Sequence, residues 1–419
     1  METFTRLESN VRVYCRKYPK VFAKARGATL LDEDNNSYVD FLSGAGALNY
    51  GHNEPRMRDA MIEYLAGDGV LLSLDMHSAA KRSFIETFER MILTPRGLNY
   101  KMQFVGPTGT NAVEAAMKLA RKVTGRRMIA AFTHGFHGMT LGSLAATGSG
   151  SSRRGAYASL TEVIRLPYDG YFGPELNTMD LIRKYLTDPS SGFEVPAAFL
   201  LESVQGEGGL NVASARWLQE LAEFARQIGA LEILDEIQAG CGRCGTFFSF
   251  ETMDVVPDIV CLSKSLSGCG LPMAMVLMKP ELDHWAPGEH TGTFRGNNLA
   301  FVSATRAIEC FWHDDALQQQ VAAKAGRIRE RLESICATVP GSRVKGRGMF
   351  QGIELGQPDC GAAVLAEAFT RGLIIEVCGP HDEVLKLMPP LTITEQELAG
   401  GLSILEVSIN ALGLAQPQI

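Results

Sequence analysis

The 419-residue chain carries a net charge of −7, is 46% hydrophobic and 21% charged, and has a mean hydropathy of +0.01. This composition is typical of a soluble globular protein, and no basic run is long enough to form a nucleic-acid-binding patch. No apolar stretch reaches the roughly 20 residues that a membrane span needs, and the polar N-terminus lacks a signal segment. We therefore expect a cytoplasmic protein without nucleic-acid or membrane partners.

The first elements along the chain predict a β-hairpin, because apolar segments at 28–31 and 37–42 flank the polar turn residues 32–36. Helical spacing of apolar residues follows at 112–123 and again at 217–228. Short apolar runs between and after these helices predict strands at 128–132, 197–201, 231–234 and 259–262. The last hundred residues predict a long helix at 317–336, strands at 348–355 and 372–378, and a capping box, Thr394 with Glu397, that opens the final helix.

Strands that alternate with helices predict an α/β fold with a mainly parallel sheet covered by helices. The two ends of the chain differ from this middle part and predict a smaller α+β domain. We expect a large cofactor-binding domain at 55–310 and a small domain assembled from 1–54 and 311–419. Ligands of such sheets bind at the carboxyl ends of the strands.

Cysteine and histidine spacing does not predict a metal site. The nine cysteines are odd in number, and only Cys241 and Cys244 have a two-residue separation, so we expect reduced thiols. His134 and His137 lie three residues apart without further metal ligands around them, which favours a polar loop.

Charged residues stand at the ends of two predicted strands. Asp235 and Glu236 follow the strand at 231–234, where an acid can bind a metal, act as acid or base, or pair with Arg243 of the next loop. For either acid alone, the ion pair is the favoured interpretation. Lys264 follows the strand at 259–262, and an amine there can condense with a carbonyl if its pKa is lowered. A surface lysine would be the better interpretation if Lys264 stood alone.

A third element favours a functional site. The small loop 106–111 leads into the helix at 112–123, and the free N–H groups of a helix N-terminus attract anions. The loop matches neither a Walker motif nor a dinucleotide fingerprint. A phosphate site without nucleotide motifs, an amine and a carboxylate together suit pyridoxal phosphate as cofactor.

The chain resembles the class III aminotransferases of fold type I over nearly its whole length. The resemblance lies in the segments "ILDEIQAGCGR", "LSKSLSGCGLPM", "LESVQGEGG", "FHG" and "GTFRGNNLA", which occur in the family's order. Any one of these segments alone would be weak evidence.

The resemblance implies roles for individual residues. Lys264 resembles the lysine that holds the cofactor and shuttles a proton, and Asp235 resembles the acid that pairs the pyridine nitrogen. Gln238 matches the group near the ring hydroxyl, and Phe136 matches the aromatic ring stacked on the cofactor.

Four further expectations follow from the same resemblance. Gly109 and Thr110 match the phosphate loop, and Glu207 matches a glutamate near the substrate. Thr293 matches a threonine that reaches the cofactor phosphate of a neighbouring subunit, which implies a homodimer or higher homo-oligomer with shared active sites.

Within the family, the segments 44–53, 74–81 and 106–125 are most similar to the group that forms diaminobutyrate for ectoine synthesis. This similarity implies amino transfer from L-glutamate to L-aspartate 4-semialdehyde, giving L-2,4-diaminobutyrate and 2-oxoglutarate. The alternatives are a class III transaminase acting on ornithine, GABA, lysine or another amine, an aminomutase or racemase of the same fold, and a binding protein that has lost catalysis.

Two residues depart from what is expected. Lys386 stands where many relatives carry an arginine that clamps a substrate carboxylate, and a lysine cannot make the bidentate contact. Glu232 lies inside a strand that is predicted to be buried, where an unpaired carboxylate is costly.

Overall fold

The computed structural model describes residues 2–358 and 360–415 of the chain. A seven-stranded sheet forms the centre, in the order β4-β12-β11-β10-β7-β5-β6. Neighbouring strands from β11 to β6 run parallel, and β12 is antiparallel to both of its neighbours, so the sheet is mainly parallel as predicted. The strands are β4 Lys101–Phe104, β5 Ile129–Phe132, β6 Val163–Leu166, β7 Ala198–Leu201, β10 Leu231–Asp235, β11 Ile259–Leu262 and β12 Met275–Met278.

Helices cover both faces of this sheet, because its strands are apolar on both sides. Ile233 of β10 packs in the cluster that contains α6 side chains, whereas the next residue, Leu234, packs in the cluster that contains Trp217 of α10. The helices of this part of the chain are α4 Pro55–Ala66, α5 Ala79–Phe88, α6 Gly109–Thr124, α7 Leu141–Ala146, α8 Gly150–Arg154, α9 Thr178–Thr187, α10 Ala215–Ile228 and α11 Asn298–Phe311. Short helical turns lie at η1 Glu89–Leu93, η2 Thr94–Arg96, η3 Ser249–Thr252, η4 Lys264–Ser267, η5 Pro280–Leu282 and η6 Thr293–Gly296.

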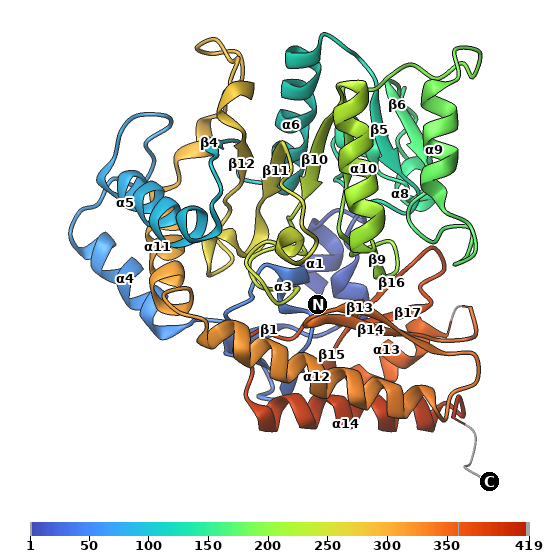
Figure 1. Ribbon diagram of the computed structural model, residues 1–419. Coiled ribbons are helices and arrows are strands. Elements are labelled where there is room, and N and C mark those ends of the chain that lie inside the picture. The colour runs from blue at the N-terminus through green and yellow to red at the C-terminus, as the bar shows by residue number, and fades with distance from the viewer. Residues whose placement is uncertain (1, 359, 416–419) are drawn as a thin grey trace.

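The two ends of the chain meet beside this layer, and the blue and red segments lie together at the bottom of Figure 1. Strand β15 near the C-terminus pairs in parallel with β3 near the N-terminus, with Leu373 opposite Val39. The sheets here have the orders β1-β2-β3-β15 and β13-β14-β17-β16, and a small hairpin joins β8 Val204–Gln205 to β9 Asn211–Val212. The strands are β1 Phe22–Arg26, β2 Thr29–Asp32, β3 Ser37–Asp40, β13 Arg343–Arg347, β14 Phe350–Glu354, β15 Leu373–Ile374, β16 Glu376–Cys378 and β17 Val384–Leu387.

The helices of the terminal parts are α1 Glu2–Leu7, α2 Tyr14–Lys17, α3 Ser43–Gly46, α12 Ala316–Cys336, α13 Gly361–Thr370 and α14 Glu395–Ala411. The predicted capping box is confirmed at the start of α14, where Thr394 and Glu397 bond each other's backbone. The boundaries predicted at residues 54 and 310 stay predictions, and residues 1, 359 and 416–419 of the terminal parts lie outside the described residues.

The predicted strands of the large sheet are confirmed to within one residue at each end. Two details differ. The helix predicted at 112–123 begins three residues earlier, at Gly109, so the expected phosphate loop is the first turn of α6. The segment predicted as one strand at 372–378 is split into β15 and β16, which belong to different sheets.

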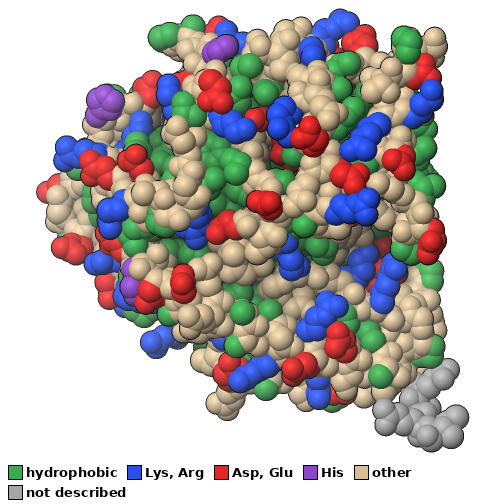
Figure 2. Space-filling view, in the orientation of Figure 1, with side chains coloured by type: hydrophobic (Ala, Val, Ile, Leu, Met, Phe, Trp, Pro, Cys, Tyr) green, Lys and Arg blue, Asp and Glu red, His purple; other side chains and the backbone are tan. Residues whose placement is uncertain are grey.

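The surface in the orientation of Figure 1 carries Lys and Arg interspersed with Asp and Glu, and Figure 2 shows apolar side chains exposed between them. Among residues 2–358 and 360–415, no helix combines the length and apolar character that crossing a membrane requires.

Candidate active site

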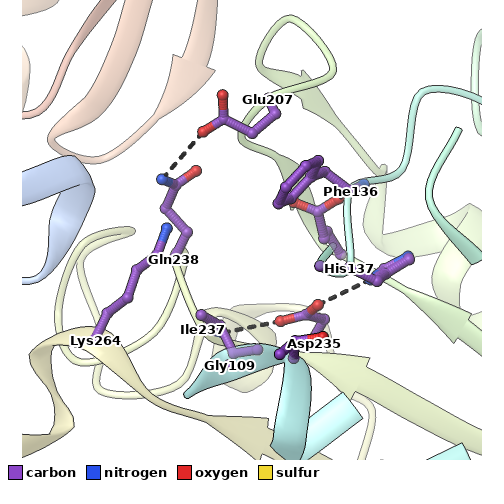
Figure 3. A pocket seen from close by; sticks show the side chains of 11 residues that line it. Gly109, Phe136, His137, Glu207, Asp235, Ile237, Gln238 and Lys264 are labelled. Atoms are coloured by element: carbon purple, nitrogen blue, oxygen red, sulfur yellow. Dashed lines mark hydrogen bonds and ion pairs between the residues drawn. The ribbon is translucent and has the colours of Figure 1, made fainter. Parts of the chain in front are cut away.

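A cavity of about 200 Å³ opens at the carboxyl ends of the parallel strands. Its lining brings together seven of the eight predicted site residues (Figure 3). Phe136 stands across the cavity from Gln238 and Lys264, with Asp235 and Gly109 between them at one end. The lining residues are Gly109, Thr110, Phe136, His137, Gly138, Glu202, Glu207, Asp235, Ile237, Gln238 and Lys264.

Lys264 follows β11 in the first position of η4 and extends into the cavity (Figure 3). Its backbone has φ +49°, a left-handed conformation that costs a non-glycine residue about 1 kcal/mol and that occurs at functional sites. Burial lowers the pKa of Lys264 to about 8, against the opposing charge of Glu207. A large fraction of neutral amine is therefore present near pH 8, which is the reactive form.

Asp235 ends β10 and is buried at the base of the cavity. Its Oδ2 lies 2.8 Å from His137 Nδ1, and its Oδ1 accepts the Ile237 N–H at 3.1 Å. The sequence favours a polar loop for His137, but its side chain is buried and fixes the orientation of the acid. The only sequence signal for this role was its place in the "FHG" segment.

Glu207, Gln238 and Lys386 are linked at the opposite end of the cavity. Lys386 Nζ donates to Glu207 Oε1 at 2.7 Å and to the Gly206 carbonyl at 3.3 Å, and Gln238 Nε2 lies 3.4 Å from the same Glu207 oxygen. Burial opposes ionisation of both groups, but their mutual attraction outweighs it, lowering the pKa of Glu207 to about 2 and raising that of Lys386. Lys386 thus has a partner that the sequence did not reveal.

Glu202 also lines the cavity, and the sequence reasoning did not select it. Its Oε1 accepts the Phe136 N–H at 2.9 Å, and its Oε2 accepts the Gly206 N–H at 3.0 Å. Burial raises the pKa of Glu202 to about 7, although the nearby His137 charge and the two N–H groups oppose the rise. Its position directly after β7, within the quoted segment "LESVQGEGG", was the available signal.

The N-terminus of α6 forms another wall of the cavity through Gly109 and Thr110. The first N–H groups of a helix have no partner within the helix and attract an anion, as the helix dipole also does. Gly138 closes this corner with φ +129°, and a Cβ atom there would lie 2.5 Å from Thr110 Oγ1.

Thr293 is the predicted site residue that the cavity does not include. It is exposed at the start of η6, and it does not line this cavity. Its predicted contact with the cofactor of a neighbouring subunit stays a prediction.

The ion pair expected between Arg243 and an acid at the end of β10 does not form. Arg243 pairs with neither Asp235 nor Glu236. It is buried and donates to the carbonyls of Met349 and Pro389 and to Asn49 Oδ1, whereas Glu236 accepts from Ser249.

Glu232 is buried as the strand requires, and its Oε1 has no hydrogen-bond partner within the described part of the chain. Burial, reinforced by the charge of Asp258, raises the pKa of Glu232 to about 8, so the side chain is mostly protonated at neutral pH. The buried carboxyl group of Glu232 is tolerated because it is neutral, not because a charged partner compensates it.

The donor set fits pyridoxal phosphate. An amine of lowered pKa, a buried acid held by a histidine, and a helix N-terminus share one cavity, and the buried His137 Nε2 has no partner within the described residues. Within the same residues, no group of His, Cys, Asp and Glu is arranged to hold a metal ion. The thiols of Cys241 and Cys244 are buried, and burial raises the pKa of both.

Comparisons with known proteins show which family the chain is similar to. A diaminobutyrate–2-oxoglutarate transaminase from Bordetella parapertussis is 52% identical, covering 100% of this chain and 97% of its own length. The enzyme of the same name from Vibrio cholerae is 54% identical over 97% of this chain and 99% of its own.

Solved structures share the fold of the chain. The ornithine aminotransferase from Toxoplasma gondii superposes with a TM-score of 0.83 at 25% identity, covering 98% of this chain and 94% of its own. An aminotransferase from Bacillus anthracis, at 24% identity, shares the fold with a TM-score of 0.85, covering 98% and 97%. The sequence profile of the family described as "Aminotransferase class-III" matches residues 13–409. The chain therefore belongs to the class III aminotransferases.

Proposed function

We propose that this enzyme transfers the amino group of L-glutamate to L-aspartate 4-semialdehyde, giving L-2,4-diaminobutyrate and 2-oxoglutarate. The observation that carries the proposal is the full-length identity of 52% and 54% to two diaminobutyrate–2-oxoglutarate transaminases. A cavity lined by Lys264, Asp235 and the N-terminus of α6 supports it.

We infer that pyridoxal phosphate is the cofactor, as the family implies. When bound, it supplies an aldehyde that condenses with amines and a ring that accepts electrons from the substrate carbon. The N–H groups of Gly109 and Thr110 would hold the phosphate, Phe136 would pack against the ring, and Gln238 would lie near the ring hydroxyl. Asp235, fixed by His137, would keep the ring nitrogen protonated through its negative charge.

Lys264 has the properties of the proton carrier. Its neutral Nζ would accept a proton from the substrate carbon and later return one to the cofactor, which requires an amine with a pKa near the working pH. The strand end and the left-handed turn hold the side chain in the cavity.

Glu207 lines the cavity, and it is paired with Lys386, which is fully buried and is not among the lining residues. The two substrates differ in charge at the end remote from the reacting amine, where glutamate has a carboxylate and diaminobutyrate has both an ammonium and a carboxylate. An ammonium is favoured beside Glu207, and a carboxylate is favoured beside Lys386 if Glu207 turns away. The pair therefore suits an enzyme that accepts both substrates in turn.

We also propose a homodimer with shared active sites. Thr293 and Phe294 are exposed, with Phe294 64% accessible, and an isolated bridge between Leu72 and Asn297 joins their segment to residues 70–76. That segment exposes Val70, Leu71, Leu72, Leu74 and Met76. A contiguous apolar surface of this kind is typical of a protein interface. The cytoplasmic location and the use of the product for ectoine remain predictions.

The half-reaction separates this function from its alternatives. The purified enzyme with bound pyridoxal phosphate is mixed with one amine at a time, and conversion of the cofactor to its aminated form is followed by absorbance. We expect conversion by L-glutamate and L-2,4-diaminobutyrate, and at least tenfold slower conversion by ornithine, GABA and lysine. Faster conversion by one of those three would contradict the proposed substrate. Turnover without any keto-acid acceptor would indicate an aminomutase or racemase instead.

A further inference from the structure

Glu202 connects two loops that approach the cavity from different strands. It follows β7 directly, is buried, and uses both carboxylate oxygens as acceptors. One oxygen bonds the N–H of Phe136, in the loop after β5, and the other bonds the N–H of Gly206, in the loop after β8. A single carboxylate therefore spans the two walls of the site.

Each wall carries a different part of the predicted chemistry. On one side, Phe136 presents its ring to the cavity (Figure 3). On the other side, the Gly206 carbonyl accepts Lys386 Nζ, and the next residue, Glu207, forms the ion pair with Lys386. Glu202 thus bonds the backbone of Phe136, which would contact the cofactor, and of Gly206, which precedes the Glu207 that would contact the substrate.

The surrounding structure leaves this connection little freedom. The Tyr168 hydroxyl donates to the Glu202 carbonyl at 2.7 Å and fixes its backbone. A Cβ atom on Gly206 would overlap Gln238 Oε1, so the backbone there is held against the cavity wall. If either loop moves, it must therefore break its hydrogen bond to the Glu202 carboxylate or move the carboxylate with it.

We propose that Glu202 is a positioning residue that couples the aromatic wall at Phe136 to the Glu207–Lys386 ion pair. A ligand that orders Phe136 then also orders the Gly206–Glu207 segment, which prepares the charged end of the cavity for the substrate. The coupling belongs to the chain itself, and only its effect on turnover rests on the proposed function.

The test compares Glu202→Gln with the unmodified enzyme. A glutamine keeps the shape, but its carbonyl oxygen accepts one N–H while its amide nitrogen cannot accept the other. We expect amide hydrogen exchange, measured without cofactor, to speed up about tenfold or more in both 133–138 and 203–210. Titration with pyridoxal phosphate should protect 203–210 in the unmodified enzyme and fail to protect it in the variant.

Glu232→Gln is the matched control, because Glu232 on β10 also has a buried carboxylate but does not line the cavity. It should leave exchange in both segments unchanged. A Glu202→Ala variant removes the hydrogen bond that a glutamine could keep. It should speed up exchange in both segments by more than Glu202→Gln does. Faster exchange in only one segment, or in neither, would overturn the coupling.

Kinetics provide a second readout. Loss of one buried hydrogen bond is worth about tenfold, and we expect it in the KM for glutamate rather than in kcat, because the ion pair and not Lys264 is displaced. A fall in kcat alone with unchanged exchange would contradict the positioning role while leaving the proposed reaction intact. Conversely, if the exchange results support the coupling but the enzyme prefers another amine, only the proposed substrate is contradicted.

Discussion

Two lysines of the active-site region differ in charge behaviour: Lys264 lines the cavity and is half-buried, and Lys386 is fully buried beside Glu207. Lys264 lies at the end of β11, where the charges of Glu207 and Asp235 act on it without a direct hydrogen bond. Burial therefore dominates and lowers its pKa to about 8. Lys386 on β17 touches Glu207 at 2.7 Å, so attraction dominates and its pKa rises. Burial alone therefore does not decide whether a lysine is a nucleophile or an anchor. The presence of a carboxylate at bonding distance decides it.

The largest effect is expected from removing the reactive member of the pair. Lys264→Ala deletes the amine that moves the proton, so transamination should fall by about 10⁴-fold or more. The rate of the glutamate half-reaction and the absorbance of the bound cofactor measure this loss. A variant that retained full turnover would refute the assignment of Lys264.

Asp235→Asn tests the negative charge at the base of the cavity rather than the amine itself. The asparagine keeps the contact with His137 but removes the negative charge, so some cofactor should remain bound while kcat falls by about 10²- to 10³-fold. Cofactor content and kcat are measured on the same preparation. Near-normal turnover would mean that the acid is wrongly assigned.

The anchoring pair should respond asymmetrically, because Lys386 is fully buried whereas the Glu207 side chain is 37% exposed to the cavity. Glu207→Leu strands a buried cation and should lower the free energy of unfolding by about 3 kcal/mol. Lys386→Met leaves a carboxylate that water can reach and should cost about 1 kcal/mol. Urea unfolding of both variants and of the double variant measures the difference, and equal losses would contradict the asymmetry.

A third buried group extends the comparison to acids. Burial raises the pKa of Glu232 to about 8 in the folded state. The folded state therefore keeps a proton that the unfolded state loses once the pH exceeds the ordinary pKa of a glutamate. Its contribution is therefore fully favourable below about pH 4.5 and declines as the pH rises toward 8. We expect stability to fall by roughly 5 kcal/mol over this window from Glu232 alone. The pH dependence of unfolding should be flatter in Glu232→Gln, and an unchanged slope would contradict this origin.

The smallest expected effect is a shift in the titration of Lys264. Its pKa is lowered by Lys386 and raised by Glu207, so Lys386→Met should raise it and Glu207→Leu should lower it. Amine labelling of the cofactor-free protein between pH 6 and 10 follows the neutral fraction. We expect shifts of a few-fold in the labelling rate, in opposite directions for the two variants. Shifts in the same direction would show that the charges are not coupled in this way.

The site was predictable where chemistry follows directly on a strand. Lys264 and Asp235 stand at the ends of apolar runs, and strands that run parallel bring such ends to one edge of a sheet. The fold was predictable for the same reason, because the buried strands of a covered sheet are short apolar runs. The start of α6 was misplaced because Gly109 and Thr110 look like loop residues although they form a helical turn.

Contacts between distant segments were not predictable from local pattern. Glu207 and Lys386 are far apart in sequence, and nothing near either residue indicates the other. Glu202 was missed because its partners are backbone N–H groups, which every residue has. Helices α4, α5 and α11 were also not identified, and α11 is apolar around much of its surface, which obscures the helical period.

The parallel pairing of β3 with β15 has a consequence for how the chain is made. Val39 lies opposite Leu373, so 334 residues must be synthesised after the first strand before its neighbour exists. At ribosomal rates this delay is roughly 20–70 s. The central sheet can assemble during that time, whereas the N-terminal hairpin must wait with an unpaired edge. The charged end of the cavity depends on β17, which emerges later still. A nascent chain therefore acquires the strand carrying its reactive lysine before the strand carrying its anchoring lysine.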